Sequence, residues 1–347
     1  MRHFSVLVAA STLILILAGG LVTSTGSGLA VPDWPNTYGW FMFTFPLDKM
    51  VGGIFYEHGH RLIASTVGFL ILVQAVWLWR REPRAWVTRL GFIALGAVIV
   101  QGILGGITVL WFLPDPVSIS HAGLAQIVLC LTVAIALVTS RGWLESYAHR
   151  GGVAPDDRTL QKIAIATTAL IYTQIIIGAT MRHTNSGLAI PDFPWAFGQL
   201  VPPEWNAKIA IHYAHRAGAL VVSIMILATT LHVFAHERSR RELVGPSVLL
   251  LVLLAVQVML GAFVIWSGKQ FVINSLHVMT GASVLATSLV LTLRAHRARF
   301  AASQDAAYED AVVRRAELAA SKDAAYEARG AADEARGAAY DNRRARA

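Results

Sequence analysis

The stretch GSGLAVPDWP (26–35) occurs a second time as NSGLAIPDFP (185–194) in this chain of 347 residues. Further motifs follow each copy in the same order and at a nearly constant offset: EHGHR is matched by HYAHR, QGILGG by QVMLGA, and a lone His121 by His277. Self-similarity of this kind is typical of a fold built from repeated units. The motifs therefore predict two equivalent halves.

The composition predicts that these halves lie in a membrane. The chain is 55% hydrophobic and 14% charged, whereas soluble domains carry about 25% charged residues. A span needs about 20 apolar residues, and eight stretches qualify: 4–24, 58–79, 88–112, 118–140, 160–181, 211–235, 244–266 and 271–293. The first is read as a helix and not as a signal peptide, because it lacks a clear cleavage site and its counterpart recurs internally.

The expected fold is an all-α integral membrane protein with eight transmembrane helices. They would form two tandem four-helix bundles related by a parallel pseudo-two-fold repeat, since both halves enter from the same side. We expect the halves to be residues 1–145 and 146–299. Residues 300–347 are rich in alanine and in charges of both signs, which predicts a cytoplasmic tail that is disordered or loosely helical.

The net charge of +8 is explained by topology, so it does not indicate a nucleic-acid partner. Basic residues cluster in alternate connections, and by the positive-inside rule these face the cytoplasm. Both termini are then cytoplasmic, the loops 25–57 and 182–210 lie outside, and the expected location is the plasma membrane. The one cysteine, Cys130, can form no intrachain disulfide and is expected to be a buried thiol.

The repeated outer loop has its own expected conformation. Gly28 and Gly187 would supply backbone with positive φ. Asp33 and Asp192 would cap a turn or a short helix. Two interpretations remain open: a tight loop folded over the bundle, and a lid over a bound ligand.

Four histidines keep their places in the repeat: His60, His121, His215 and His277. Each lies near the start of a span that runs inward, so all four are expected at a similar depth towards the outer face. Two imidazoles on neighbouring helices can approach a flat macrocycle from opposite sides, as in bis-histidine haem ligation. The alternatives are zinc or copper, which usually recruit cysteine or carboxylates, and hydrogen bonding to carbonyls at the interface. Two haem groups, each with iron held by a histidine pair, are favoured.

Glu57 precedes His60 by three residues, so the two side chains share one helical face. A carboxylate there could accept a proton, stabilise a developing cation, or cap the helix. The second half has His212 in place of Glu57. This asymmetry favours a chemical role for Glu57 in the first half.

Arg61 and Arg216 directly follow the ligand candidates. They suit haem propionates, with lipid phosphate as the alternative partner. His58 has no histidine counterpart and is expected to be solvated. Three glutamines in mid-span are expected to form hydrogen bonds between helices: Gln101, Gln174 and Gln257.

These motifs together resemble the haem A synthase family over residues 5–295. The resemblance implies membrane enzymes that oxidise the C8 methyl of haem O to a formyl group, giving haem A for cytochrome oxidases. It also implies that His60 and His121 flank the substrate haem O beside Glu57, while His215 and His277 ligate a haem b cofactor. Membrane lipid, haem O synthase and an electron acceptor are the partners to consider.

The sequence departs from the family pattern at two points. Thr23 stands where many members carry arginine, and Arg182 occupies the equivalent place in the second half. The first outer loop also lacks the two cysteines that some members have, so no thiol pair can act there. The rival functions are a dihaem electron-transfer cytochrome that modifies neither haem, and a haem carrier or transporter.

Overall fold

The computed structural model describes residues 2–145 and 157–297, with isolated residues between 313 and 330. Within these ranges the chain is helical apart from loops and two isolated β-bridges. Eight helices are long and apolar enough to span a membrane, which confirms the predicted all-α membrane fold. They are α1 (Arg2–Ser24), α2 (Gly53–Arg81), α3 (Ala85–Leu110), α4 (Asp115–Val138), α6 (Arg158–His183), α7 (Ala207–His236), α8 (Arg241–Trp266) and α9 (Phe271–Ala295). Three short helices were not predicted: η1 (Met42–Thr44), η2 (Leu47–Lys49) and α5 (Arg141–Glu145).

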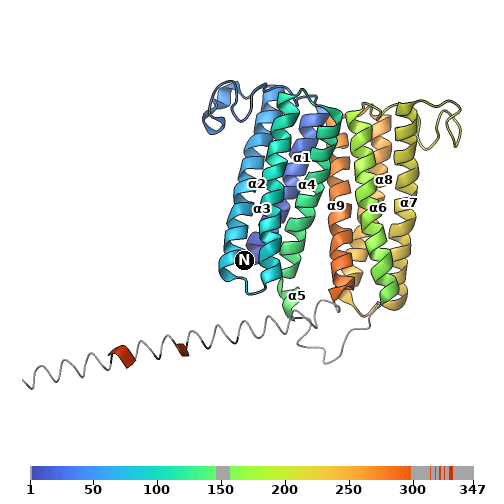
Figure 1. Ribbon diagram of the computed structural model, residues 1–347. Helices are drawn as coiled ribbons and strands as arrows, with labels where there is room; N and C mark the ends of the chain where they lie inside the picture. The colour runs from blue at the N-terminus through green and yellow to red at the C-terminus, as the bar shows by residue number, and fades with distance from the viewer. Residues whose placement is uncertain are drawn as a thin grey trace, which may run out of the picture.

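The eight long helices form two groups of four (Figure 1). In the first group α1 contacts α2 and α4, and α3 contacts α2 and α4; in the second, α6 and α8 each contact α7 and α9. The groups meet where α1 and α4 pack against α6 and α9. The same contact pattern therefore serves both halves. The boundary at 145–146 and nearly all of the 300–347 tail lie outside the described residues.

Three of the four helices that carry ligand candidates, α2, α4 and α7, begin earlier than hydropathy predicts. Helix α2 starts at Gly53, after Gly52 with φ of 56°. Helix α7 starts at Ala207, where the Asn206 side chain accepts a hydrogen bond from the amide of Ile209. The first turns contain polar residues, which a search for apolar stretches leaves out. Glu57 and His60 therefore lie within α2 and not at its first residue.

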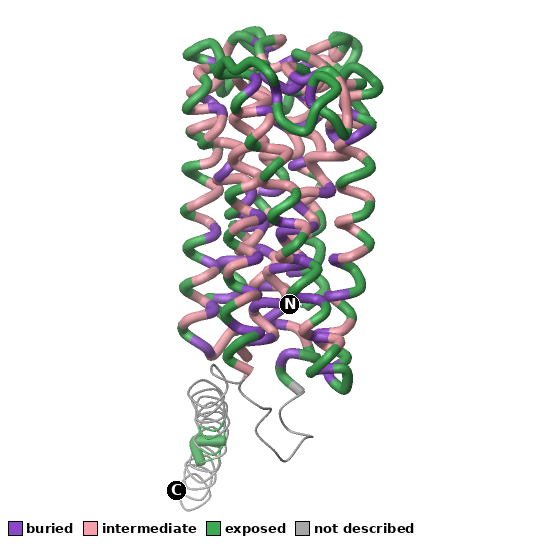
Figure 2. The backbone as a smooth tube through the Cα atoms, turned by 90° about the vertical axis from the view of Figure 1, so that its right-hand side faces the viewer, coloured by how far each residue is buried: buried purple, intermediate pink, exposed green. Residues whose placement is uncertain are grey.

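Buried residues lie inside each group, while much of the outward faces is exposed (Figure 2); the loops contain both exposed and buried residues. The core of the first half includes Val67, Ile71, Leu78, Ala94 and Ile135. The core of the second half includes Ile171, Ile226, Leu250 and Leu285. A smaller cluster joins the halves through Ile16, Leu129 and Ala282. Outward faces remain apolar as well, as expected for surfaces that meet lipid tails.

The two repeated loops lie at one end of the molecule, opposite the N-terminus (Figure 1). Each contains a cis proline, Pro35 or Pro194. The prediction that Gly28 and its counterpart supply positive φ is wrong: positive φ occurs at Gly26 (69°) and at the equivalent Asn185 (53°). Gly28 is needed for space instead, since a Cβ there would lie 3.3 Å from the side chain of Leu113.

Cys130 is free, as expected, but only partly buried. It packs at the edge of the second half's core, although it belongs to α4. The expectation of a buried thiol is therefore met only in part.

Candidate functional site

An aspartate locks each outer loop into a turn. Asp33 accepts the amides of Tyr38 and Gly39, both at 2.8 Å, and Asp192 accepts two amides in the equivalent turn at 2.8 and 2.7 Å. These bonds confirm the predicted turn capping. Partial burial raises the pKa of Asp33, but the amide hydrogen bonds outweigh it and hold the pKa below its usual value. For Asp192 the Gly198 amide is the main cause of the lowered pKa.

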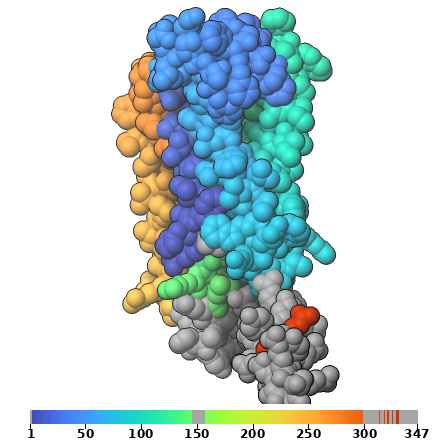
Figure 3. Space-filling view, turned by 90° about the vertical axis from the view of Figure 1, so that its left-hand side faces the viewer, coloured from blue at the N-terminus to red at the C-terminus, as the bar shows by residue number. Residues whose placement is uncertain are grey.

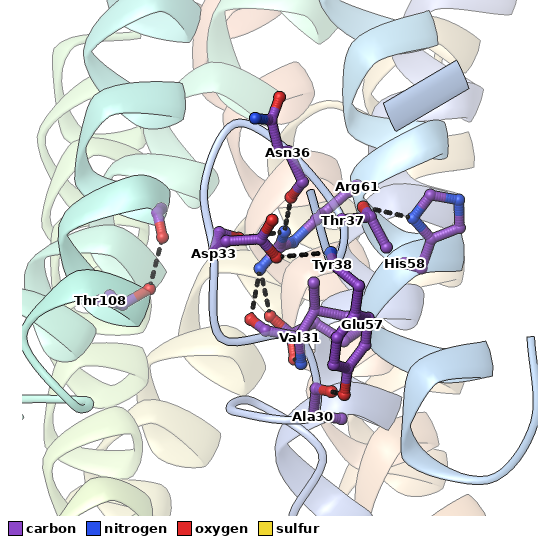
Figure 4. Close-up of polar contacts among 11 residues, drawn as sticks. Ala30, Val31, Asp33, Asn36, Thr37, Tyr38, Glu57, His58, Arg61 and Thr108 are labelled. Atoms are coloured by element: carbon purple, nitrogen blue, oxygen red, sulfur yellow. Dashed lines mark hydrogen bonds and ion pairs between the residues drawn. The ribbon is translucent and has the colours of Figure 1, made fainter. Parts of the chain in front are cut away.

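Arg61 fastens the first loop to α2 (Figure 4). Its NH1 donates to the carbonyls of Asp33 (2.7 Å) and Asn36 (3.0 Å). Its NH2 donates to the carbonyl of Val31 (3.0 Å) and to Glu57 Oε1 (2.6 Å). With 9% of its surface exposed, Arg61 is directed at the loop and not at bulk solvent.

Glu57 completes this clamp from the same helix. Its Oε2 accepts the amide of Val31 at 2.8 Å, while Oε1 pairs with Arg61. The residue is 3% exposed. Because α2 begins four residues earlier and Gly52 is its N-cap residue, the helix-capping interpretation of Glu57 is wrong. The carboxylate anchors the loop.

His212 takes the place of Glu57 in the second half. The amide of Ile190 lies 3.2 Å from its Nδ1, and Nε of Arg216 lies 3.1 Å from its Nε2. A neutral imidazole has one acceptor nitrogen, whereas a carboxylate accepts from both donors at once. Arg216 also donates to the carbonyls of Ile190 (3.1 Å) and Trp195 (2.8 Å). The second clamp thus has the same layout with a weaker anchor.

His58 is buried, so the expectation that it is solvated is wrong. It is 1% exposed, its Nδ1 lies 3.0 Å from Thr37 Oγ1, and its ring packs 5.0 Å from that of Phe45. The loop folds over the start of α2 and covers this side chain. His58 is therefore a loop-packing residue.

The loop also reaches α3. A Cβ on Gly106 would lie 2.6 Å from the ring of Trp34, so this glycine makes room for the loop aromatic. The preceding residue, Gly105, faces His121. Figure 3 shows the loop as a cap on the upper end of the first half. The loop is thus folded over the bundle, as the first of the two interpretations expected, and the lid over a ligand stays a prediction.

Each of the four candidate ligands rests its ring on a glycine of the helix before it. A Cβ built on that glycine would meet the ring's Cε1 at close range, and such an approach needs hydrogen in place of a side chain. The pairs are Gly19 with His60 (3.2 Å), Gly105 with His121 (3.1 Å), Gly178 with His215 (2.9 Å) and Gly261 with His277 (3.2 Å). These glycines were not predicted, although their even spacing in the repeat was visible in the sequence.

The three mid-span glutamines contact the same histidines, which confirms their predicted interhelical bonding. Gln101 Nε2 donates to the carbonyl of His121 at 2.9 Å, and Gln174 Nε2 donates to that of His215 at 2.6 Å. Gln257 Nε2 lies 3.3 Å from Nε2 of His277. These contacts join α3 to α4, α6 to α7 and α8 to α9.

The separation of the second histidine pair would suit two imidazole ligands of one haem iron. The ring centroids of His215 and His277 are 6.4 Å apart, and two metal–nitrogen bonds of about 2.0–2.1 Å place such centroids roughly 6–6.5 Å apart. Nδ1 of His60, His121 and His277 is buried without a hydrogen-bond partner among the described residues. The four residues nevertheless stay partly exposed, so a ligand can reach them. His60 and His121 are near enough to interact electrostatically.

A closed zinc or copper site gains no support. In the described part of the chain, no three histidine, cysteine or acidic side chains converge as metal ligands would. A cavity of about 620 Å³ exists at the other end of the first half, between α2, the connection that follows it, the end of α4 and α5. It includes no ligand candidate, being lined by Trp77, Arg81, Glu82, Pro83, Arg84, Thr139 and Leu144.

Arg182 joins the two halves near the histidines. From the last turn of α6 its NH2 donates to the carbonyl of Gly20 (2.7 Å) and to Ser24 Oγ (2.6 Å) on α1. Ser275 of α9 donates to the same Ser24 oxygen at 3.0 Å. The arginine of the second half therefore reaches into the first, beside Thr23.

Comparison with known proteins shows the family to which the chain belongs. The family model of the cytochrome oxidase assembly protein, COX15-CtaA, matches residues 2–289. A relative from Geobacillus kaustophilus is 28% identical over 90% of this chain and 97% of its own length. One from Shouchella clausii is 28% identical over 76% and 86%, and one from Symbiobacterium thermophilum is 32% identical over 65% and 73%. All three carry the name "Heme A synthase".

Proposed function

Because the chain belongs to the COX15-CtaA family of cytochrome oxidase assembly proteins, we propose that it is a haem A synthase that oxidises the C8 methyl of haem O to a formyl group. The observation that carries the proposal is the pairing of histidines at equivalent places in two four-helix groups. In the second pair the ring centroids are 6.4 Å apart, a separation at which both imidazoles would be able to hold one iron. Two histidine pairs suit one haem as substrate and one as cofactor.

The two halves divide the work in this proposal. His60 and His121 of residues 1–145 hold the substrate haem O, and His215 and His277 of residues 146–299 hold haem b. When bound, haem b supplies one-electron redox chemistry. The protein itself orients the imidazole side chains, excludes water with the outer loop and keeps the two sites adjacent.

Glu57 is the candidate catalytic carboxylate for proton or charge transfer at the reacting methyl group. It shares the outer part of α2 with His60, and its negative charge is held in place by Arg61 at 2.6 Å. Anchoring a loop does not require a carboxylate, since His212 occupies the equivalent place in the other half. The carboxylate is thus specific to the half that would receive haem O.

Arg61 and Arg216 remain the candidates for haem propionates, because each directly follows a proposed ligand. A guanidinium has five N–H donors in a fork that matches carboxylate oxygens. Several of these donors bind loop carbonyls. A propionate would therefore join the loop at the same guanidinium, which would couple loop closure to haem binding.

The orientation belongs to the same proposal. By the positive-inside rule, the basic connections favour cytoplasmic termini, with the two haem sites towards the outer face of the plasma membrane. The two outer loops lie together at one end of the structure, as this orientation requires (Figure 1).

Pigment extraction tests the proposed function. The chain is expressed in cells that contain haem O but no other haem A synthase, and the extracted haems are separated by chromatography. Haem A or a hydroxylated intermediate is expected. Recovery of only unmodified haems would favour a dihaem electron-transfer cytochrome, and a chain without tightly bound haem would favour a carrier.

A further inference from the structure

Three helices present the same pair of residues to the histidine helix that follows them. Helices α3, α6 and α8 contain QGILG (101–105), QIIIG (174–178) and QVMLG (257–261). Residues four apart lie on one helical face, so glutamine and glycine form one surface. Both contact the same histidine: in α6, for example, Gln174 and Gly178 both face His215.

The two members of each pair restrain the histidine differently. The glycine receives the edge of the ring, with 2.9 Å between Cε1 of His215 and a Cβ on Gly178. The glutamine amide holds the histidine from the side: Gln174 Nε2 lies 2.6 Å from the backbone oxygen and 3.0 Å from Nδ1. A ring fixed at its edge and through a polar atom has a defined plane and depth.

Each glutamine also has a hydrogen-bond acceptor, its side-chain oxygen, that receives no donor in the described structure. Oε1 of Gln101, Gln174 and Gln257 is buried and has no hydrogen-bond partner among the described residues. A metal-bound imidazole nearly always donates its second N–H to an acceptor, which fixes the ring and raises its basicity. Nε2 of Gln101 and Gln174 already donates to the backbone carbonyl of its histidine, and turning either amide would set two oxygens against each other. Gln257 contacts only the ring of His277. Because the O and N of a side-chain amide are assigned from their surroundings, Gln257 can serve as that acceptor.

The first histidine lacks half of this arrangement. Helix α1 has Gly19 against His60 but carries Leu15 four residues earlier, where the other faces have glutamine. Nδ1 of His60 has no hydrogen-bond partner in the described structure, as is also true of His121 and His277, but those two rings have a glutamine amide beside Nε2. His60 therefore has a glycine that sets its ring edge but no amide that holds it.

We propose that the Gln-x-x-x-Gly faces of α3, α6 and α8 are positioning elements for the three histidines they contact, and that His60, opposite Leu15, is the ligand held least firmly and released first when the substrate haem exchanges. This inference rests on the proposed haem ligation. It assigns positioning roles to Gly105, Gly178 and Gly261 and to the glutamine four residues before each of them. It also gives a physical difference between a site that must exchange its haem and one that must keep it.

Glycine-to-alanine variants test the positioning role in the full-length, haem-loaded protein. Gly178→Ala and Gly105→Ala put a methyl group against a ring, whereas Gly102→Ala on the same α3 meets nothing within 4 Å. Alanine favours a helix over glycine by about 1 kcal/mol, so a loss cannot come from a weaker helix. We expect shifted low-spin EPR lines and lost haem in Gly178→Ala and Gly105→Ala, with no shift in Gly102→Ala. Unshifted lines in both test variants would overturn the proposal.

Leucine at the glutamine positions provides a second variant set if the alanine variants do not fold. Gln257→Leu copies the α1 arrangement and should weaken haem retention by about 10–100-fold, the usual effect of losing such a partner. Leu15→Gln should slow the release of haem from the first half. An unchanged retention in Gln257→Leu together with an unchanged release in Leu15→Gln would contradict the proposal.

The proposed haem ligation, on which this inference rests, would be contradicted by a different result. If His277→Ala keeps its full haem content and low-spin spectrum, His277 is not a ligand and the proposed function loses its site. If His277→Ala loses haem while the glycine and glutamine variants keep normal spectra, only the positioning role is excluded.

Discussion

Glu57 and Arg61, one turn apart on α2, form a buried ion pair with 2.6 Å between Oε1 and NH2. Both side chains are nearly buried: 4% of the Glu57 side chain and 10% of the Arg61 side chain are exposed. Both also form hydrogen bonds to the outer loop. Breaking a buried pair by removing one partner typically costs about 3–5 kcal/mol, because the other charge is left unpaired. The loop, the carboxylate and the helix bearing His60 are therefore coupled.

Glu57→Gln should keep haem bound but strongly reduce formyl formation, because the amide cannot carry the negative charge or accept a proton. His212→Ala, at the equivalent place, should matter much less. The rate of haem A formation and the haem content per chain are the measurements.

Asp33→Asn serves as the loop control for this variant, since it loosens the turn without touching Glu57. Equal losses of activity in Glu57→Gln and Asp33→Asn would mean that loop closure, and not the carboxylate, limits the reaction. A Glu57→Gln protein that makes haem A at the original rate would falsify the catalytic role and leave the anchoring role.

The aspartate turns should open in acid. The folded-state pKa of Asp33 and Asp192 lies below the usual value of 3.8, so their contribution to loop stability is complete above that value and is lost as the pH falls through the lower, folded-state pKa. Hydrogen exchange at the amides of Tyr38 and Gly39, compared with core amides, should show the loss. In Asp33→Asn the first loop should lack this pH dependence, and a wild-type-like dependence in that variant would exclude Asp33 as its source.

Arg182→Met should destabilise the junction between the halves. The change removes charge-assisted hydrogen bonds to the carbonyl of Gly20 and to Ser24, and bonds to charged groups contribute about 1.5–3 kcal/mol each. A lower unfolding temperature of the purified protein is expected. Arg241→Met, at an exposed position on α8, is the matched control. Equal unfolding temperatures for the two variants would show that Arg182 does not stabilise the junction between the halves.

The membrane topology should place Asn36 and Arg84 on opposite sides. Asn36 lies in the outer loop, and Arg84 lies between α2 and α3 at the other end of the bundle. Reporter fusions at the two positions report their sidedness directly. Matching signals would contradict the arrangement, whereas an outer Asn36 and an inner Arg84 would support it.

The helices and the pairing of the ligand candidates were predictable because both leave periodic traces in the sequence. Apolar length revealed the spans, and the repeat singled out His60 and its three counterparts. The burial of His58 beneath the outer loop was not predictable. His58 is covered only because residues 36–46 fold back over α2, and such long-range packing leaves no local pattern.

The glycine contacts were predictable in principle but carried an ambiguous signal. QGILG and QVMLG recur in the repeat, yet a glycine in a membrane helix usually indicates helix–helix packing in general. Only the structure shows that Gly105 and Gly261 face histidine rings. The partner of Glu57 was hidden for a similar reason: a carboxylate one turn from an arginine predicts an ion pair, but not that the amide of Val31 joins it.

The most direct test of the central claim is to identify which haem remains when one histidine pair is removed. The double variants His60→Ala/His121→Ala and His215→Ala/His277→Ala are purified from cells that supply haem O, and their pigments are extracted and quantified per chain. The account predicts that the first variant keeps haem b and contains neither haem O nor haem A, while the second loses haem b. Identical pigments in the two variants would contradict it.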